Sequence, residues 1–145
     1  MSALDALTKL IKSSEGCKLT AYQCPAGVWT VGYGCTGNGI VKGTVWTQIQ
    51  ADQSLHELAL KMLDDACRLS PILATASVSR HVAIADFIYN LGEGNYQKST
   101  LKLRVDKGEW VSAQTEIKKW NKGGGKILTG LVIRRQKEAD MLGDL

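Results

Sequence analysis

Apolar positions along the chain recur mostly at helical spacing. Residues 3–12 carry leucines and an isoleucine three and four positions apart, and Ser2 precedes them as a predicted N-cap. Residues 47–69 form a longer amphipathic stretch, which Pro71 ends. Residues 77–91 are mostly apolar, which is typical of a helix at the centre of a bundle. These three segments predict a helical core.

The segment from residue 18 to residue 40 has a different pattern. It is rich in Thr, Tyr, Val, Trp and Gly, alternates over 28–33, and has turn residues at 25–27 and 37–39. This pattern predicts two or three short strands. Shorter helices are predicted further along the chain, at about 99–107, 109–120 and 129–142.

Together these elements predict an α+β fold in a single domain, residues 1–145. A small β-lobe, about 14–46, is joined by the long helix to a helical lobe, about 70–145, which the N-terminal helix completes. A chain of 145 residues has room for one such domain. A cleft between the two lobes is the expected place for a binding site.

Composition and charge narrow the class of protein. Hydrophobic residues make up 44% and charged residues 22%, as in ordinary soluble globular proteins. The net charge of +4 favours binding to an anionic polymer. It does not distinguish nucleic acid, lipopolysaccharide and bacterial wall. No apolar run approaches the ~20 residues of a membrane span, and residues 1–14 lack the apolar stretch of a secretory signal. We therefore expect neither membrane insertion nor self-directed export.

The four cysteines contain no C-x-x-C pair, which argues against a zinc site. Without an export signal we expect reduced thiols, each packed as a small apolar residue. Cys67 fits this best, because it continues an apolar stripe through Leu60 and Leu63. No metal or cofactor is expected.

The candidate chemistry lies where the first helix gives way to the β-lobe. Glu15 is the single carboxylate there, since no Asp or Glu occurs between it and Asp52. The glycines that follow, with Tyr22, Trp29 and Tyr33, outline an aromatic-lined ribbon of the kind that binds sugars. The alternative interpretation is a solvated glutamate at a helix end followed by ordinary glycine turns.

At these residues the chain resembles the phage-type lysozymes, or endolysins, of glycoside hydrolase family 24. The resemblance runs in order along nearly the whole chain. Its motifs are Ser14-Glu15-Gly16, Ala21-Tyr22, Gly-x-x-Thr-x-Gly-x-Gly over 27–34, Thr36-Gly37, Phe87-x-x-Asn90-x-Gly92, Trp120 with a glycine-rich turn, and Gly130-Leu131-x-x-Arg134-Arg135-x-x-Glu138.

The resemblance implies a lysozyme-like fold and hydrolysis of the β-1,4 bond between N-acetylmuramic acid and N-acetylglucosamine in peptidoglycan. It implies that Glu15 is the general acid and that Cys24 and Thr30 act on the opposite face of the sugar. This chemistry needs a proton donor on one face and a negative charge, base or nucleophile on the other. A partly desolvated cleft is expected to raise the pKa of Glu15 and keep it protonated.

Cys24 stands where the family usually has Asp, which excludes a strict two-carboxylate mechanism. Its thiolate is expected to act as base or nucleophile, although a thiol with a pKa of about 8.5 is only a few per cent ionised at neutral pH. Inversion and retention at the anomeric carbon both stay open. Cys35 replaces a frequent His of the family and receives no catalytic role. A Cys24–Cys35 disulfide in an oxidising periplasm also stays open.

The family pattern further implies substrate binding by Tyr89, Asn90 and Thr100. The competing interpretation is that Asn90, with the glycine two positions later, closes a helix, and that Thr100 caps the next one. His56 and His81 lie within predicted helices and are interpreted as surface or core residues. The basic residues toward the end of the chain are interpreted as a solvated face that assists attraction to an anionic wall: Lys118, Lys119, Lys122, Lys126, Arg134, Arg135 and Lys137.

Three other functions stay open at this point. One is a cysteine hydrolase of the wall using Cys24, which lacks a nearby His in the sequence and the usual position at a helix start. The others are a non-catalytic wall-binding protein and a lytic transglycosylase that works with one Glu.

The expected partners are peptidoglycan glycan strands, with no nucleic acid, and the expected state is a monomer. We expect the protein to stay in the host cytoplasm until a holin opens the inner membrane, without binding the holin directly. It then reaches the periplasm and the cell wall and lyses the host.

Overall fold

The N-terminal helix α1 (Ala3–Ser14) begins as its sequence predicts. The Ser2 hydroxyl accepts a hydrogen bond from the backbone N–H of Asp5 at 3.1 Å. The helix ends at Glu15, whose backbone is extended and whose N–H still bonds within the last turn. The chain enters the β-lobe directly after this residue. The computed structural model describes residues 1–144.

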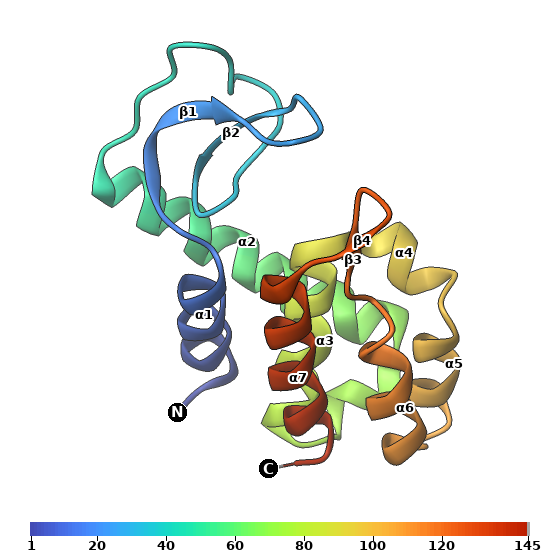
Figure 1. Ribbon diagram of the computed structural model, residues 1–145. Helices are drawn as coiled ribbons and strands as arrows, with labels where there is room; N and C mark the ends of the chain where they lie inside the picture. Colours follow the sequence, from blue (N-terminus) through green and yellow to red (C-terminus); the bar gives the residue numbers. More distant parts are fainter. Residues whose placement is uncertain (145) are drawn as a thin grey trace.

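The β-lobe contains two antiparallel strands, β1 (Lys18–Gln23) and β2 (Trp29–Gly32). Tyr22 is paired with Thr30, and the register is irregular nearer the start of β1. A long loop then wraps around the pair before the next helix begins (Figure 1). Two strands lie within the predicted two or three.

Helix α2 (Gln48–Leu69) connects the two lobes. It begins with a capping box, in which the Thr47 side chain and the Gln50 side chain each bond to the other residue's backbone N–H. Figure 1 shows α2 running from beneath the β-lobe into the helical lobe. A short 3₁₀ helix, η1 (Pro71–Ala74), follows at the predicted proline break.

The buried face of α2 differs from the predicted stripe. Of the predicted stripe only Leu63 is buried, since Leu60 is 44% exposed and Cys67 is half-buried. The buried row of α2 runs instead through Leu55, Ala59, Leu63 and Ala66. His81 Nε2 lies 2.9 Å from the Leu63 carbonyl oxygen and 3.3 Å from Cys67 Sγ. His81 is therefore a half-buried structural residue, and His56 lies exposed on α2, as expected of both.

Helix α3 (Val78–Leu91) is the centre of the helical lobe, as its apolar sequence predicts. Every residue from 82 to 88 is buried, and the helix packs against α1, α2 and α7 (Thr129–Leu142). Gly92 ends it with a φ of +93°, a conformation that glycine adopts readily. Asn90 therefore lies in the last turn, and Gly92 closes the helix.

The remaining elements complete the lobe and place both termini at the end away from the β-lobe (Figure 1). Ser99, rather than Thr100, caps its helix, so the capping interpretation of Thr100 is wrong. The helix α4 and the β3–β4 hairpin were not expected from the sequence. In order these elements are α4 (Glu93–Gln97), α5 (Thr100–Asp106), α6 (Trp110–Ile117), β3 (Lys122–Gly123) and β4 (Lys126–Ile127).

The arrangement is the expected α+β one, with a small β-lobe, a long connecting helix and a helical lobe (Figure 1). Within residues 1–144, none of the helices combines the length and the apolar character that crossing a bilayer requires.

Candidate active site

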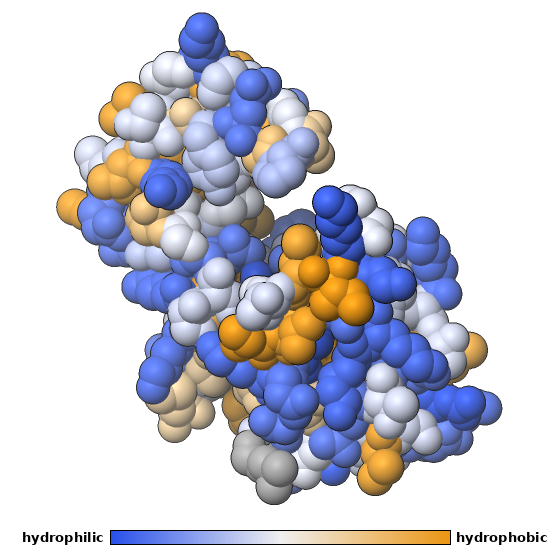
Figure 2. Space-filling view, viewed as in Figure 1, coloured by the Kyte–Doolittle hydropathy of each residue, from blue (hydrophilic) through white to orange (hydrophobic). Residues whose placement is uncertain are grey.

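Glu15 lies at the junction of the two lobes, where two surface hollows adjoin. The first, the α1–α7 hollow, has a volume of about 490 Å³ and is lined by residues 13–15, Asn90 and residues between 128 and 137. The second, the α2–α3 hollow, has a volume of about 270 Å³ and is lined by residues 34–36 and by side chains of α2 and α3. Figure 2 shows the surface drawn in between the β-lobe and the helical lobe.

Gly34 brings the β-lobe backbone against the Glu15 carboxyl group. A Cβ atom on Gly34 would lie 3.1 Å from Glu15 Oε2, and the φ of Gly34 is +78°. Gly34 also lines the α2–α3 hollow, so the Glu15 carboxyl group, which lines the α1–α7 hollow, lies close to a residue of the other hollow. Its side chain is 26% exposed, so it is shielded yet reachable from solvent.

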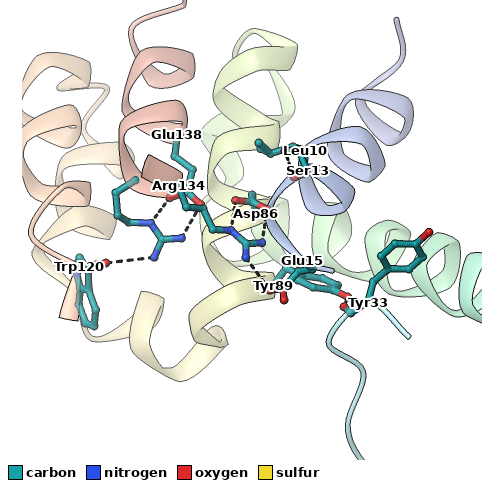
Figure 3. A network of polar contacts seen from close by, with 10 residues as sticks. Leu10, Ser13, Glu15, Tyr33, Asp86, Tyr89, Trp120, Arg134 and Glu138 are labelled. Atoms are coloured by element: carbon teal, nitrogen blue, oxygen red, sulfur yellow. Dashed lines mark hydrogen bonds and ion pairs between the residues drawn. The ribbon is translucent and has the colours of Figure 1, made fainter. Parts of the chain in front are cut away.

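Arg134, near the middle of α7, holds the Glu15 carboxyl group from the helical lobe. Its Nη1 donates to Glu15 Oε1 at 2.7 Å, while Nε and Nη2 donate to the two carboxylate oxygens of Asp86 at 2.9 and 2.8 Å (Figure 3). Asp86 is fully buried in α3. The two-point bond to Asp86 fixes the plane of the guanidinium and so the position of the third bond.

A second buried acid extends this row into the core. Glu138 of α7 accepts from Arg135 Nη2 at 2.9 Å and makes hydrogen-bond contact with Asp86. Burial and the neighbouring Asp86 raise the pKa of Glu138 well above its ordinary value, against the opposing effect of Arg135. Burial also acts to raise the pKa of Asp86, but hydrogen bonds from Arg134 and Glu138 outweigh it and lower that pKa.

Cys24 begins the turn that follows β1, and Thr30 lies in β2 on the other side of that turn. The Cys24 pKa is lowered, mainly by backbone hydrogen bonds, that of Val28 first, and also by the Thr30 hydroxyl. Cys24 is half-exposed, whereas Thr30 is buried and also donates to the Val28 carbonyl at 3.0 Å. Negative charge on Cys24 and on Glu15 each acts on the Tyr22 hydroxyl, which places Tyr22 near both groups.

The three residues expected to bind substrate have different positions. Tyr89 lines the α2–α3 hollow, and its hydroxyl donates to the Tyr33 carbonyl oxygen (Figure 3). Asn90 lines the α1–α7 hollow, and its Oδ1 is buried without a hydrogen-bond partner. Thr100 is exposed on α5 and lines neither hollow. The structure therefore brings Glu15, Tyr89 and Asn90 together and leaves Thr100 apart.

Of the other cysteines, Cys35 lines the α2–α3 hollow, whereas Cys17 and Cys67 line neither hollow. Cys35 is buried with its Sγ 3.0 Å from the Ser54 hydroxyl, and all four thiols are free. In the described part of the chain, no group of three or more His, Cys, Asp or Glu side chains is arranged to hold a metal ion.

One interpretation of the sequence is wrong. Arg134 and Arg135 are buried to 4% and 0% exposure, whereas the lysines of the same basic group lie on the surface as expected. The arginines are inside because each has a buried carboxylate partner. Asp86, a lone acid within the apolar stretch of α3, is the sequence signal that predicts such a partner.

Comparison with known proteins gives one consistent family. The Phage lysozyme family model matches residues 12–138. The chain is 37% identical over 138 residues to an endolysin of Acyrthosiphon pisum secondary endosymbiont phage 1, covering 89% of each. It is 34% identical over 140 residues to an endolysin of Bacillus phage B103, covering 95% of this chain and 52% of that one.

Solved structures give the same result. An endolysin from Escherichia coli O157:H7 phage FAHEc1 superposes with a TM-score of 0.83 at 29% identity, covering 99% of this chain and 94% of the other. The muramidase domain of SpmX from Asticaccaulis excentricus superposes with a TM-score of 0.81 at 28% identity, covering 94% of each. The resemblance drawn from the motifs and the lysozyme-like fold that it implied are confirmed. The chain belongs to the phage lysozyme family and is a glycoside hydrolase of the lysozyme type.

Proposed function

We propose that this protein is an endolysin that hydrolyses the β-1,4 bond between N-acetylmuramic acid and N-acetylglucosamine in peptidoglycan, with Glu15 as the general acid. One observation carries the proposal. The Glu15 carboxyl group lies where two hollows adjoin, held by Arg134 from one lobe and closely approached by Gly34 of the other. A glycan strand that fills both hollows passes this carboxyl group.

The proposed reaction begins with proton transfer from Glu15 to the bridging oxygen. As that bond breaks, positive charge develops at the anomeric carbon and ring oxygen of the muramic acid. Arg134 keeps Glu15 in place during the transfer and stabilises the carboxylate that results. The free 4-hydroxyl of N-acetylglucosamine then leaves.

Cys24 and Thr30 are proposed to act on the opposite face of the sugar. The hydrogen bonds that lower the Cys24 pKa increase the thiolate fraction at neutral pH, which supports a role as base or nucleophile. The Thr30 hydroxyl, which does not titrate, is suited to hold the attacking water. A base gives inversion through one water attack, and a nucleophile gives retention through a thioglycoside that water then cleaves.

Asn90 and Tyr89 are the proposed contacts to the glycan. The buried Oδ1 of Asn90 has no partner, and the N–H of an N-acetyl group is a donor that would satisfy it. The Tyr89 hydroxyl donates to the Tyr33 carbonyl oxygen, which restrains the side chain where it lines the α2–α3 hollow. A binding role for Thr100 stays a prediction from the family pattern alone.

The test is product analysis on purified peptidoglycan with the wild-type protein and Glu15→Gln. Wild-type protein is expected to release fragments with reducing muramic ends, as mass spectrometry detects, and Glu15→Gln is expected to release none while still binding the wall. Glu116→Gln, on the far helix α6, is the matched control and should cleave normally. Lysis by Glu15→Gln contradicts the proposal, and anhydro-muramic ends indicate a transglycosylase instead.

We also propose that the protein is a monomer that reaches the wall only after a separate holin opens the inner membrane, without direct contact between the two. The exposed lysines around the end of the chain would then assist binding to the anionic wall. A chemical that permeabilises the inner membrane should replace the holin in triggering lysis of cells that express this chain. Lysis without any permeabilisation contradicts this route.

A further inference from the structure

A third hollow lies where the loop after β2 enters α2, and no step of the proposed reaction uses it. We call it the Trp46 hollow. It has a volume of about 310 Å³ and is lined by Trp46 and by four side chains of α2, which are Gln50, Gln53, Ser54 and Glu57. The four α2 positions are three and four apart, so their side chains lie on one face of the helix.

The Trp46 hollow adjoins the α2–α3 hollow. The Ser54 hydroxyl, in its wall, lies 3.0 Å from Sγ of Cys35, which lines the α2–α3 hollow. Each α2 residue of the Trp46 hollow also has a counterpart eight positions later that lines the α2–α3 hollow, namely Leu58, Lys61, Met62 and Asp65. Eight residues correspond to about 12 Å along a helix, a distance that a short oligosaccharide spans.

The Trp46 ring has a fixed position in this hollow. Gly32, at the end of β2, lies directly against it, since a Cβ atom on Gly32 would be 3.0 Å from Cζ3 and 3.1 Å from Cε3 of Trp46. The φ of Gly32 is +67°, which also favours glycine. Trp46 is half-buried, so part of its side chain packs on β2 and part is exposed to the hollow. An aromatic side chain that is already immobilised loses little conformational entropy when a ligand stacks on it.

The polar groups around this ring suit a neutral ligand that is rich in hydroxyl groups. Gln53 and Glu57 are exposed at the hollow, where they can bond to hydroxyl and amide groups. Gln50 Oε1 accepts from the Thr47 N–H at 2.8 Å, which holds the Gln50 amide in place. Among residues 1–144 no lysine or arginine lines the hollow, and Glu57 is its single charged side chain, so a phosphate or carboxylate ligand is disfavoured. A sugar, which has apolar C–H faces and polar edges, matches an aromatic platform with such neighbours.

We propose that the Trp46 hollow is a saccharide-binding site, which holds an N-acetylglucosamine unit stacked on Trp46 and hydrogen-bonded to Gln53 and Glu57. The proposal rests on the proposed function in taking wall glycan as the ligand. None of these three residues lines the hollow that contains Glu15, so the site holds the glycan and takes no part in the chemistry. The sugar belongs either to the strand in the cleft or to a neighbouring strand, and the test below distinguishes the two.

The test is an NMR titration of isotope-labelled Glu15→Gln protein, which lacks the proposed acid, with the trimer and the hexamer of N-acetylglucosamine. The Trp46 indole N–H signal is expected to shift in a saturable manner, and the Gly34 amide signal reports binding in the cleft. The Trp110 indole signal, from α6, should stay in place. Gln53→Ala, added to the same protein, should weaken binding at Trp46 about three- to tenfold, because it removes one hydrogen bond.

His56→Ala is the matched control, since His56 is exposed on the same helix and lines none of the three hollows. It should leave the affinity unchanged. Gln53 and His56 are both exposed, so the comparison does not require removal of the packed Trp46 ring. If one strand fills both hollows, the hexamer binds more tightly than the trimer and moves the Trp46 and Gly34 signals together. If the bound sugar belongs to a neighbouring strand, the trimer and the hexamer bind at Trp46 with similar affinity.

The outcomes separate this proposal from the proposed function. A Trp46 signal that does not move at the highest oligomer concentration, or equal affinity in Gln53→Ala and His56→Ala, overturns the site. A shifted Gly34 signal in the same titration then leaves glycan binding in the cleft intact. Continued lysis by Glu15→Gln refutes the general-acid role, whereas the Trp46 titration still reports whether the hollow binds sugar.

Discussion

Arg134 donates a hydrogen bond to Glu15 across 119 positions of sequence, and this bond ties the last helix to the start of the β-lobe. The same guanidinium is anchored to Asp86 by two further bonds. The acid that faces the cleft is therefore positioned from the core of the helical lobe. Stability and activity should depend together on this one arginine.

Arg134→Ala is expected to lower both the stability of the fold and the activity on peptidoglycan. It leaves Asp86 buried and unpaired, which should lower the free energy of unfolding by about 3–5 kcal/mol. It also frees the Glu15 side chain, which should reduce kcat on peptidoglycan about 100-fold. Urea unfolding and a wall-clearing assay measure the two effects.

Arg134→Lys and Gln136→Ala complete that experiment. Lysine keeps the charge but loses the planar three-bond geometry, so it should recover part of the stability and little of the activity. Gln136 is exposed on the same helix, and its substitution should change neither. Full activity in Arg134→Lys would show that the charge alone is sufficient.

Glu138 should make the protein less stable as pH rises. Its pKa is raised in the folded state, so the folded protein binds more protons than the unfolded chain above the ordinary glutamate pKa. Stability is then full below that value and falls as pH increases, by at most about 1.4 kcal/mol per pH unit for one proton. Glu138→Gln should flatten this slope at pH values above the ordinary glutamate pKa.

Urea unfolding at a series of pH values measures the slope. Asp86 contributes in the opposite direction, because its pKa is lowered and its stabilisation is lost only as the solution becomes strongly acidic. The two contributions therefore occupy different pH ranges. Equal slopes for wild type and Glu138→Gln would mean that Glu138 is ionised in the folded protein.

Features that depend on nearby residues, such as helix caps and apolar helices, could be predicted from the sequence. Ser2 caps α1 because its hydroxyl reaches an N–H three residues away, and α3 is central because residues 82–88 are all apolar except Asp86. The position of Glu15 between helix and strand was predictable for the same reason. The β3–β4 hairpin was not, since two-residue strands carry almost no alternating pattern.

Apart from the lone acid Asp86, the pairing of the buried charges could not be predicted in this way. Nothing near Arg134 in the sequence distinguishes it from the exposed lysines of the same region, and charged residues on helices usually face solvent. Its partner Asp86 is 48 positions away, so only the packing of α3 on α7 brings the two together. The pair of Arg134 and Asp86, which supports Glu15 in the candidate site, was therefore found only in the structure.

Asn90→Ala tests the glycan contact. Because Asn90 Oδ1 has no partner in the unbound protein, its removal should leave the free energy of unfolding unchanged or slightly higher. A lost hydrogen bond to substrate should lower kcat/KM about three- to tenfold. Asn95→Ala is the matched control, because Asn95 donates to the Leu91 carbonyl at 2.7 Å and should lose stability instead of activity.

The final prediction concerns the acidic limit of the pH profile, which Cys24 should determine. Its thiol must ionise to act as base or nucleophile, so hydrolysis should rise with pH through a thiol pKa that lies below the ordinary value. Cys24→Asp supplies a carboxylate with an ordinary pKa of about 3.9 and should extend activity to lower pH by several units.

Cys24→Asp should also abolish inactivation by thiol alkylation, while Cys24→Ser should reduce kcat about 100-fold or more, since a serine hydroxyl does not ionise in this range. Cys17→Ser, at a half-buried cysteine outside the turn, should keep both the profile and the sensitivity. An acidic limit that stays in place in Cys24→Asp would assign it to a different group. The thiolate would then have no part in the chemistry, and Thr30 alone would remain to hold the water on that face.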